Sequence, residues 1–372
     1  MDHSELTYYL ALHFTSGIGS RRLLALMAYF NSAERAFNAP MRDVLNVPGF
    51  GKGTSEALIS NREDALKEAA AQIERLPERT TILTYFDEGY PADLKSTYSP
   101  PPLLYICGNA ALLREERMIA IVGSRKTSDY GRRAAKEFAE ELIREHVTIV
   151  SGFAKGIDTA AHQAAFEAGG KTIAVLGSGV DVIYPYSNKA FAEELAASDR
   201  GAIVSELPLG TKPDARNFPW RNRIVSGLAR ATIVVESEVQ GGSMITASLA
   251  LDENRDVFAV PGDIYRSSSS GPNHLVRESR ARLASSAAQV LADLGWAGEG
   301  VAKQPKPVDR AGLSMFEAKI IDVLEAAGGP LQVDALAERA GLDVQDILVQ
   351  LLTLEFKSIV RQMAGKQFVL VG

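Results

Sequence analysis

The chain has 372 residues and a formal net charge of −6, with 46% apolar and 23% charged residues. These values are typical of a folded protein with two or three domains and exclude a disordered chain. No apolar run approaches the roughly 20 residues of a membrane-spanning helix, and the first residues lack the basic segment of a signal peptide. The single cysteine, Cys107, excludes an internal disulfide and a cysteine-based zinc site. We therefore expect a cytoplasmic protein without a membrane partner.

Residues 1–80 are predicted to form an all-α domain. Two glycine-rich turns, residues 16–19 and 47–53, precede helical patterns at Arg21–Phe30 and Thr54–Asn61. This pattern is typical of a SAM-like or tandem helix-hairpin-helix domain, in which hairpin N–H groups can hold a DNA phosphate. The domain has nine basic and ten acidic side chains, so the hairpins could equally serve only for packing. The sequence leaves both alternatives open.

Residues 81–295 alternate predicted strands and helices, as expected for a Rossmann-like, doubly wound and mostly parallel α/β sheet. Strands are expected at Met118–Val122, Val147–Val150, Thr172–Leu176, Ala202–Ser205, Thr232–Val235 and Val257–Val260. Helices are expected at Tyr130–Glu145, Asp158–Glu167, Lys189–Ala197, Ser243–Leu251 and His274–Leu283. Ligands of such sheets bind beyond the carboxyl ends of the strands, so we expect the functional site in this domain.

The C-terminal part is predicted to be a linker, residues 296–313, followed by a winged-helix domain, residues 314–372. The domain combines three helical patterns with a strand pair, at Ser314–Ala327, Val333–Ala340, Val344–Phe356, Ile359–Met363 and Gln367–Val371. It contains five basic and eight acidic side chains. An acidic third helix would repel a DNA backbone, so we favour a protein-contact role for this domain.

Three turns of the sheet domain have the composition of a phosphate site. They comprise Gly123, Ser124 and Arg125 after the first strand, Ser151, Gly152, Lys155 and Gly156 after the second, and Gly241, Gly242 and Ser243 before a later helix. Glycine and serine allow a phosphate close to the backbone, helix N-termini present free N–H groups, and arginine adds a bidentate fork. The glycines could also serve tight packing, and Asp158 is expected to cap its helix.

A further segment, residues 210–230, combines aromatic side chains with five basic and one acidic side chain. Its candidate binding residues are Lys212, Arg216, Phe218, Arg221, Asn222 and Arg223. Aromatic rings can stack on the bases of a single strand while guanidinium groups contact its phosphates. We expect Arg221 or Arg223 to face the ligand. Phe218 or Trp220 would stack a base, unless Phe218 belongs to the core, and Asn222 could fix the loop.

In combination, these motifs resemble the DNA-processing protein family DprA (Smf). The resemblance rests on Tyr90-Pro91, residues 101–105, 120–125, 151–158, 160–162, 218–223 and 260–262. It implies a homodimeric protein that binds single-stranded DNA without sequence preference, protects incoming DNA and loads the RecA recombinase in natural transformation. The chain departs from the family pattern at residues 241–244, where Gly-Gly-Ser-Met replaces the usual Ser-Gly-Ser-Leu, and after Gly271.

Two other functions share this type of core: a nucleotide phosphoribohydrolase-like enzyme and a sensor of small nucleotides. The hydrolases carry a Pro-Gly-Gly-x-Gly-Thr-x-x-Glu signature that residues 236–246 lack. A hydrolase would also need a carboxylate at the scissile bond, for which Glu236 and Asp158 are the candidates. His162 has no accompanying nucleophile or metal ligands and is expected to be structural. We therefore expect a binding protein rather than an enzyme, with no cofactor and no metal.

Overall fold

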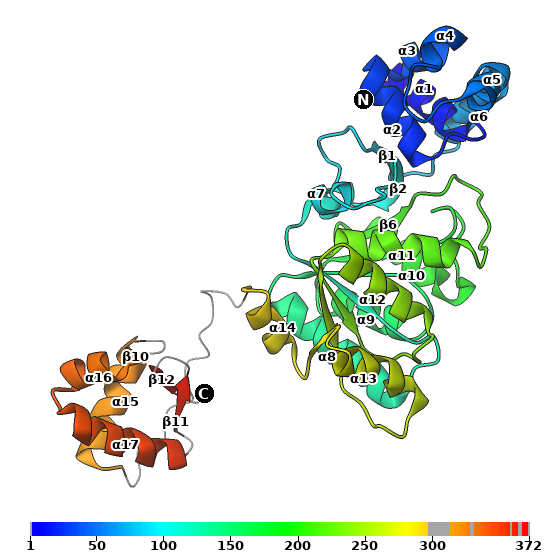
Figure 1. The fold of residues 1–372 in the computed structure, drawn as a ribbon. Helices are drawn as coiled ribbons and strands as arrows, with labels where there is room; N and C mark the ends of the chain where they lie inside the picture. Colours follow the sequence, from blue (N-terminus) through cyan, green and yellow to red (C-terminus); the bar gives the residue numbers. More distant parts are fainter. Residues whose placement is uncertain (1, 297–312, 328–330, 358, 364–366, 371–372) are drawn as a thin grey trace. The chain divides into compact units, whose positions relative to one another are not determined.

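A nine-stranded mixed sheet organises the first of two units in the computed structural model (Figure 1). The described residues are 2–296, 313–327, 331–357, 359–363 and 367–370. The two units span residues 1–293 and 294–372. The predicted linker falls almost entirely on residues 297–312, which lie outside the described part of the chain.

The sheet has the strand order β1-β2-β6-β5-β4-β3-β7-β8-β9. The strands are β1 Thr80–Thr84, β2 Leu103–Gly108, β3 Met118–Val122, β4 Thr148–Ser151, β5 Thr172–Val175, β6 Gly201–Ser205, β7 Ala231–Val234, β8 Asp256–Ala259 and β9 Arg282–Leu283. Strands β3 to β9 pair with one another in parallel, whereas β1 and β2 extend the β6 edge in antiparallel pairing. Successive strands move from β3 to one edge, and the chain then resumes at β7 on the other side of β3. This reversal creates a topological switch point between β3 and β7, where α/β sheets bind ligands.

Helices cover both faces of the sheet. They are α7 Ala92–Lys95, α8 Asp129–Arg144, α9 Ile157–Glu167, α10 Lys189–Ala197, α11 Asn217–Leu228, α12 Gly242–Asp252, α13 Ser270–Arg277 and α14 Ala287–Asp293. Helices α11 and α12 lie side by side on one face, while α8 and α9 pack together on the other (Figure 1). All five residues of β3 are buried, because a central parallel strand is covered on both faces. The predicted Rossmann-like fold class is confirmed.

The N-terminal helices share a hydrophobic core with the edge of the sheet. They are α1 His3–Phe14, α2 Ser20–Phe30, α3 Ala33–Asn38, α4 Met41–Val44, α5 Lys52–Ser60 and α6 Arg62–Glu74. Leu10 and Leu23 belong to the same buried cluster as Leu103 and Tyr105 of β2. The Tyr9 hydroxyl donates to the Pro102 carbonyl at 2.8 Å. The helical domain is therefore anchored on β2 by packing and by a buried hydrogen bond.

Two predicted elements of the sheet domain are wrong. The segment around Phe218, interpreted as a loop, forms the start of α11, because Pro219 lies in the first turn, where a missing N–H is tolerated. The helix expected at His274–Leu283 ends at Arg277, since Ser279 adopts a left-handed conformation with φ 56°. Residues 282–283 then join the sheet as β9. The sequence also missed the short strands β1 and β2.

The second unit contains the predicted winged helix. It consists of α15 Met315–Ala327, β10 Leu331–Gln332, α16 Val333–Ala340, α17 Val344–Phe356, β11 Val360–Met363 and β12 Gln367–Leu370, with sheet order β10-β12-β11. Ile320, Leu336 and Leu351, one from each helix, meet in a separate core. Among the described elements of this unit, β10 is the one that the sequence did not predict. Among the described residues of both units, no helix is long and apolar enough to cross a membrane.

Candidate nucleic-acid interface

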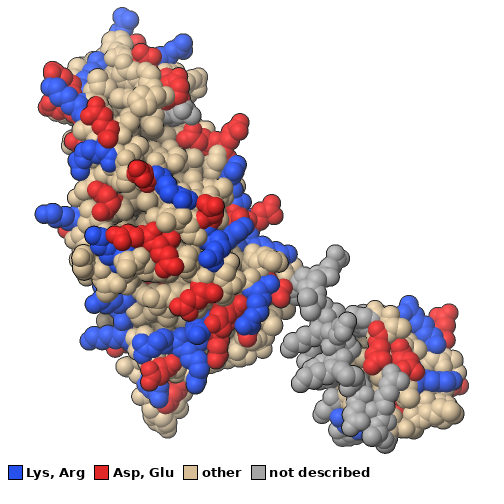
Figure 2. Space-filling view, turned by 180° about the vertical axis from the view of Figure 1, so that it is seen from behind, with Lys and Arg blue, Asp and Glu red and all other residues tan. Residues whose placement is uncertain are grey.

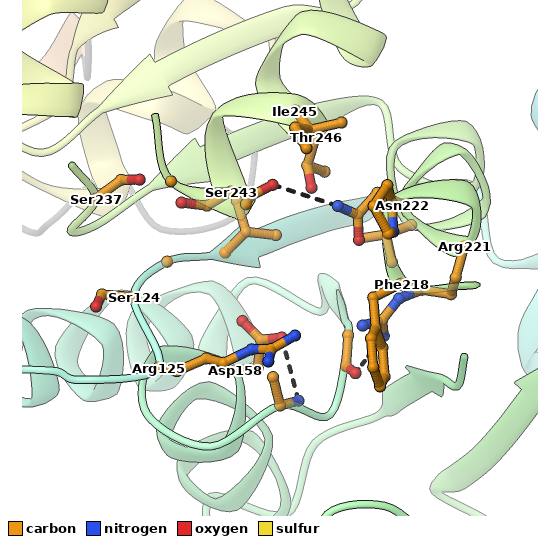
Figure 3. A pocket seen from close by; sticks show the side chains of 18 of the residues that line it. Ser124, Arg125, Asp158, Phe218, Arg221, Asn222, Ser237, Ser243, Ile245 and Thr246 are labelled. Atoms are coloured by element: carbon orange, nitrogen blue, oxygen red, sulfur yellow. Dashed lines mark hydrogen bonds between the residues drawn. The ribbon is translucent and has the colours of Figure 1, made fainter. Parts of the chain in front are cut away.

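A cavity of about 950 Å³ lies beyond the carboxyl ends of β3, β4 and β7, at the switch point of the sheet (Figure 3). Its walls are the turns that follow these strands and the N-terminal parts of α11 and α12. A smaller cavity of about 240 Å³ shares Arg125, Phe218 and Arg221 with it and adds Lys155. The structure thus brings all three predicted turns and the start of α11 to one place.

The turn between β3 and α8 is held by hydrogen bonds within the protein. The Ser124 N–H donates to the Glu236 carbonyl at 2.7 Å, and the Ser124 hydroxyl accepts the Lys126 N–H at 3.1 Å. The Ser124 N–H is therefore engaged within the protein and is not free for a phosphate. A Cβ on Gly123 would lie 2.5 Å from Ile157 Cγ1, and one on Gly156 would lie 2.2 Å from the Ser124 carbonyl oxygen. These two glycines let neighbouring turns pack closely.

Glu236 anchors this turn from the end of β7. Its side chain is buried, and its carboxylate accepts the Ser128 N–H at 2.9 Å and the Ser128 hydroxyl at 2.5 Å. The hydroxyls of Thr127 and Ser268 also donate to it, at 3.1 and 3.2 Å. Both carboxylate oxygens of Glu236 are engaged by hydrogen bonds, and Glu236 does not line the cavity. Its carboxylate is therefore not placed to act on a scissile bond of a ligand in the cavity.

Arg125 projects from the turn into the cavity. Its side chain is exposed, and its guanidinium carbon lies 5.1 Å from the centre of the Phe218 ring, a cation–π geometry. Figure 3 shows Arg125 reaching from its turn toward Asp158 and the cavity interior. Among the described residues, Arg125, Lys126 and Lys155 have no ion pair with a carboxylate. Their charges are thus available to an external anion.

Arg221 lies at the floor of both cavities. It is 5% exposed, and its guanidinium donates to the carbonyls of Gly152 and Val175 at the ends of β4 and β5. Burial lowers the pKa of Arg221 to about 10, against the opposing effect of Asp158. Burial raises the pKa of the Asp158 carboxyl, an effect that Arg221 opposes. A Cβ on Gly152 would lie 2.5 Å from Arg221, so this glycine admits the guanidinium.

Arg223 points away from the cavities. Its side chain is 10% exposed, pairs with Glu206 and donates to the Ser99 carbonyl at 2.7 Å. Burial raises the pKa of Glu206, and Arg223 opposes that rise. Trp220 is 53% exposed and stacks with Arg223, with 4.5 Å between the guanidinium carbon and the ring centre. Neither Trp220 nor Arg223 lines either cavity.

The remaining residues of this segment lie at the rim. Lys212 and Arg216 are exposed and flank a stretch that lines the large cavity. Arg216 donates three hydrogen bonds to the Asp214 carboxylate, one from its backbone N–H and two from its guanidinium. The Asn222 amide donates to the Gly242 carbonyl at 3.3 Å and so connects α11 to α12. Asn222 therefore lines the cavity from a helix, and the expectation that it fixes a loop is wrong.

The N-terminus of α12 opens onto the large cavity. No side chain caps this helix, which begins after Gly241. Ser243 is 8% exposed, and its buried hydroxyl has no hydrogen-bond partner among the described residues. A Cβ on Gly242 would meet nothing within 4 Å, so this side of the cavity has room for a ligand. Helix N-termini with free N–H groups attract anions.

Two further predictions concern buried polar residues. Asp158 does not cap α9: the N-cap is Gly156, and the Asp158 carboxylate accepts the Ala154 N–H at 3.3 Å. His162 is buried with Nδ1 2.6 Å from the Thr172 hydroxyl, and burial lowers its pKa to about 3. Ser151 is also buried, and its hydroxyl donates to the Ile121 carbonyl at 2.6 Å. These groups support the strand ends.

Tyr184 is one of the site residues that the sequence missed. Its side chain is 44% exposed and lines both cavities, and its ring centre lies 5.6 Å from that of Phe218. The aromatic pair Tyr184 and Tyr186 around Pro185 was the available signal. In the described part of the chain, no three His, Cys, Asp or Glu side chains are grouped to hold a metal ion.

Fold and site define a doubly wound α/β protein with a basic, aromatic-walled cavity at its switch point. A family model described as DNA recombination-mediator protein A matches residues 81–295, and one described as the DprA winged helix domain matches residues 304–366. The chain belongs to the DprA (Smf) family of DNA-processing proteins, as the motifs indicated.

Relatives with more than 30% identity match three quarters or more of the chain. Protein Smf of Synechocystis sp. is 33% identical over 99% of this chain and 99% of its own length. The DNA processing protein DprA of Streptococcus pneumoniae is 38% identical over 75% of this chain and 94% of its own.

Two of the solved structures that resemble this chain are DprA proteins. The X-ray structure of DprA from S. pneumoniae has a TM-score of 0.67 and 35% identity, covering 77% of this chain and 97% of that one. DprA from Helicobacter pylori, whose structure is described by its single-stranded DNA binding mode, has a TM-score of 0.53 and 29% identity. That match covers 58% of this chain and 95% of the other.

Proposed function

We propose that this chain binds single-stranded DNA without sequence preference and delivers it to a RecA-type recombinase, acting as a binding protein rather than an enzyme. The observation that carries the DNA proposal is Arg125 lying over the Phe218 ring at the carboxyl end of β3. Every nucleotide can bind to cationic groups and aromatic rings, because every nucleotide carries a phosphate and a base with a π-face. A duplex keeps its bases stacked, so an aromatic cavity wall favours a single strand.

The charge distribution is compatible with this proposal despite the net charge of −6. On the face of the first unit seen in Figure 2, basic and acidic side chains are interspersed. Such a surface gives a polyanion no extended basic area. A cavity with cationic walls on an acidic body would therefore concentrate DNA binding at one place.

Fluorescence anisotropy with labelled oligo-dT and a matched duplex, across a salt series, tests the proposal. We expect tight, salt-sensitive binding with preference for the single strand. Arg125→Ala should weaken it about 10- to 150-fold, from the ~1.5–3 kcal/mol of a hydrogen bond to a charged group. Arg144→Ala is the matched control, since Arg144 is 69% exposed at the far end of α8. Absence of binding at low salt would refute the proposal.

Delivery to a recombinase and homodimerisation are supported by the family resemblance. The winged helix adds support for a protein partner, because α17 carries Asp346 and Glu355 and no Lys or Arg. Recombinase ATPase activity on single-stranded DNA, with and without the protein, tests delivery. Light scattering of the full chain tests the dimer.

A second candidate function is the sensing of a small nucleotide. Its support is the large cavity, about 950 Å³, which falls within the range of small-molecule sites. Competition by a free nucleotide against labelled oligo-dT separates the two functions, because a sensor would bind the free nucleotide at least as tightly as the polymer.

A further inference from the structure

The solvent side of α17, the third helix of the second unit, is apolar. Val344, Leu348 and Leu352 recur every four residues along this helix and are 38%, 47% and 56% exposed. Val349 beside them is 60% exposed. Because residues four apart lie on one face of a helix, these four side chains form a continuous surface, the α17 stripe. Single exposed apolar residues are ordinary, whereas a continuous group marks an interaction site.

The α17 stripe is not part of the core of its own unit. The side of α17 that faces α15 and α16 consists of Ile347, Leu351 and Leu354, which are buried in the shared hydrophobic cluster. None of the four stripe residues belongs to that cluster or packs against it. The apolar surface of the stripe is therefore available to another molecule.

The charges of α17 do not suit DNA. In winged helices that bind a duplex, the third helix enters the groove and needs Lys or Arg to contact phosphates. Residues 344–356 contain neither, and the N-cap Asp343 and the following Asp346 are exposed carboxylates. This surface would repel a duplex. Two copies of the same face would likewise oppose like charges.

The same features suit a cationic amphipathic helix. Such a helix packs an apolar face of residues three or four apart against an apolar surface. From Val344 to Leu352 the stripe rises about 12 Å, or a little more than two helical turns. Lys or Arg at the border of the partner's apolar face would meet Asp343 and Asp346, and complementary charge selects and orients a partner.

We propose that the α17 stripe is the docking site for an amphipathic helix of a partner protein, which places apolar side chains against Leu348 and Leu352 and Lys or Arg beside Asp346. This inference goes beyond DNA binding. It rests on the proposed contact of the winged helix with a protein, and it defines the chemistry of that partner.

Fluorescence anisotropy with the full chain and labelled synthetic peptides tests the docking site. The main probe is a helical peptide of about 18 residues, long enough to form a helix, with Leu on one face and Lys on the other. One comparison peptide replaces every Lys by Glu, and another has the Leu/Lys composition in an order without an apolar face. We expect salt-sensitive binding of the Leu/Lys helix and much weaker binding of both comparison peptides.

Substitutions on α17 test the residues themselves. Leu348→Gln and Leu352→Gln should each weaken binding of the Leu/Lys helix about 5- to 15-fold, because each leucine is about half exposed and would lose that contact area. Asp346→Asn should weaken it and reduce its salt dependence. Leu45→Gln is the matched control, because Leu45 is 42% exposed but belongs to the first unit. Thermal melts verify that each variant is folded.

The outcomes identify what occupies the stripe. No binding of the Leu/Lys helix, equal binding of the Lys and Glu peptides, or binding that Leu348→Gln and Leu352→Gln leave unchanged overturns the proposal. A wild-type dimer that Leu352→Gln converts into a monomer in light scattering assigns the stripe to a second copy, and a labelled duplex that Leu352→Gln releases assigns it to DNA; either result overturns the proposal. Affinity for labelled oligo-dT should be equal in all variants, so failure of the docking site and failure of single-stranded DNA binding are separate results.

Discussion

Replacing Arg223 by alanine should destabilise the protein without weakening its affinity for single-stranded DNA. Arg223 and Glu206 are 10% and 11% exposed and form a buried ion pair, which a further bond to the Ser99 carbonyl supports. Removing one partner of a buried pair leaves the other charge uncompensated, at a cost of about 3–5 kcal/mol in the free energy of unfolding. The sequence alone would have placed this arginine in the binding site.

The loss of stability in Arg223→Ala should be larger at high pH than at low pH. Burial raises the folded-state pKa of Glu206, and without Arg223 nothing in the pair opposes that rise. A carboxyl with a raised folded pKa binds its proton more tightly in the folded state than in the unfolded state. The deficit of Arg223→Ala should therefore be largest above the raised pKa and shrink as pH falls through it. At low pH, Glu206 is neutral in both states.

Denaturant unfolding at neutral and mildly acidic pH, with anisotropy on labelled oligo-dT, measures both quantities. The matched control is Arg230→Ala, because Arg230 pairs with Asp93 at 2.7 Å but is 55% exposed. Exposed pairs contribute about 0–1 kcal/mol. An Arg223→Ala protein of wild-type stability that binds DNA weakly would refute the reasoning and return Arg223 to the interface.

Three other variants test the supports of the site. Glu236→Gln should lower the free energy of unfolding by about 1–3 kcal/mol, because it removes the charge and replaces the carboxylate oxygen that accepts the Ser128 and Ser268 hydroxyls by an N–H₂ group. It should also weaken DNA binding through the turn that carries Arg125, and unchanged unfolding curves would contradict this. Gly156→Ala should lose stability by about 1–3 kcal/mol, because φ is 88° and the added Cβ would lie 2.2 Å from a carbonyl oxygen, as thermal melts can show. The His162 imidazole has a folded-state pKa of about 3, against an ordinary value of 6.5. The unfolded state therefore binds more protons between these pH values, and the stability of the protein falls as the pH drops through them. His162→Gln should make that fall shallower, and a pH profile identical to that of the wild type would exclude the histidine as its cause.

Strong local patterns determined much of the fold. The five apolar residues of β3 were placed correctly because a central parallel strand is buried on both faces, and the bounds of α16 and α17 were predicted correctly from helical periodicity. The glycines after β3 and β4 allow neighbouring turns to pack closely, the alternative that the sequence left open beside a phosphate site. Strands β1 and β2 were missed because their antiparallel pairing at the sheet edge is a long-range feature.

The roles of individual side chains depended on tertiary structure. Arg221 and Arg223 are two residues apart, which on a helix means a rotation of roughly 200°, so one reaches the cavity floor and the other meets Glu206. The sequence could not distinguish the two arginines, because it showed neither that α11 is a helix nor which face of α11 meets the sheet. Tyr184 and Phe218 are 34 positions apart in the sequence, and only the packing of α11 beside the end of β5 brings their rings together. Local patterns encode strands and turns, so they were enough to show which residue types gather at the strand ends. Which of these side chains face a ligand depends on contacts between distant segments, which are present only in the folded protein.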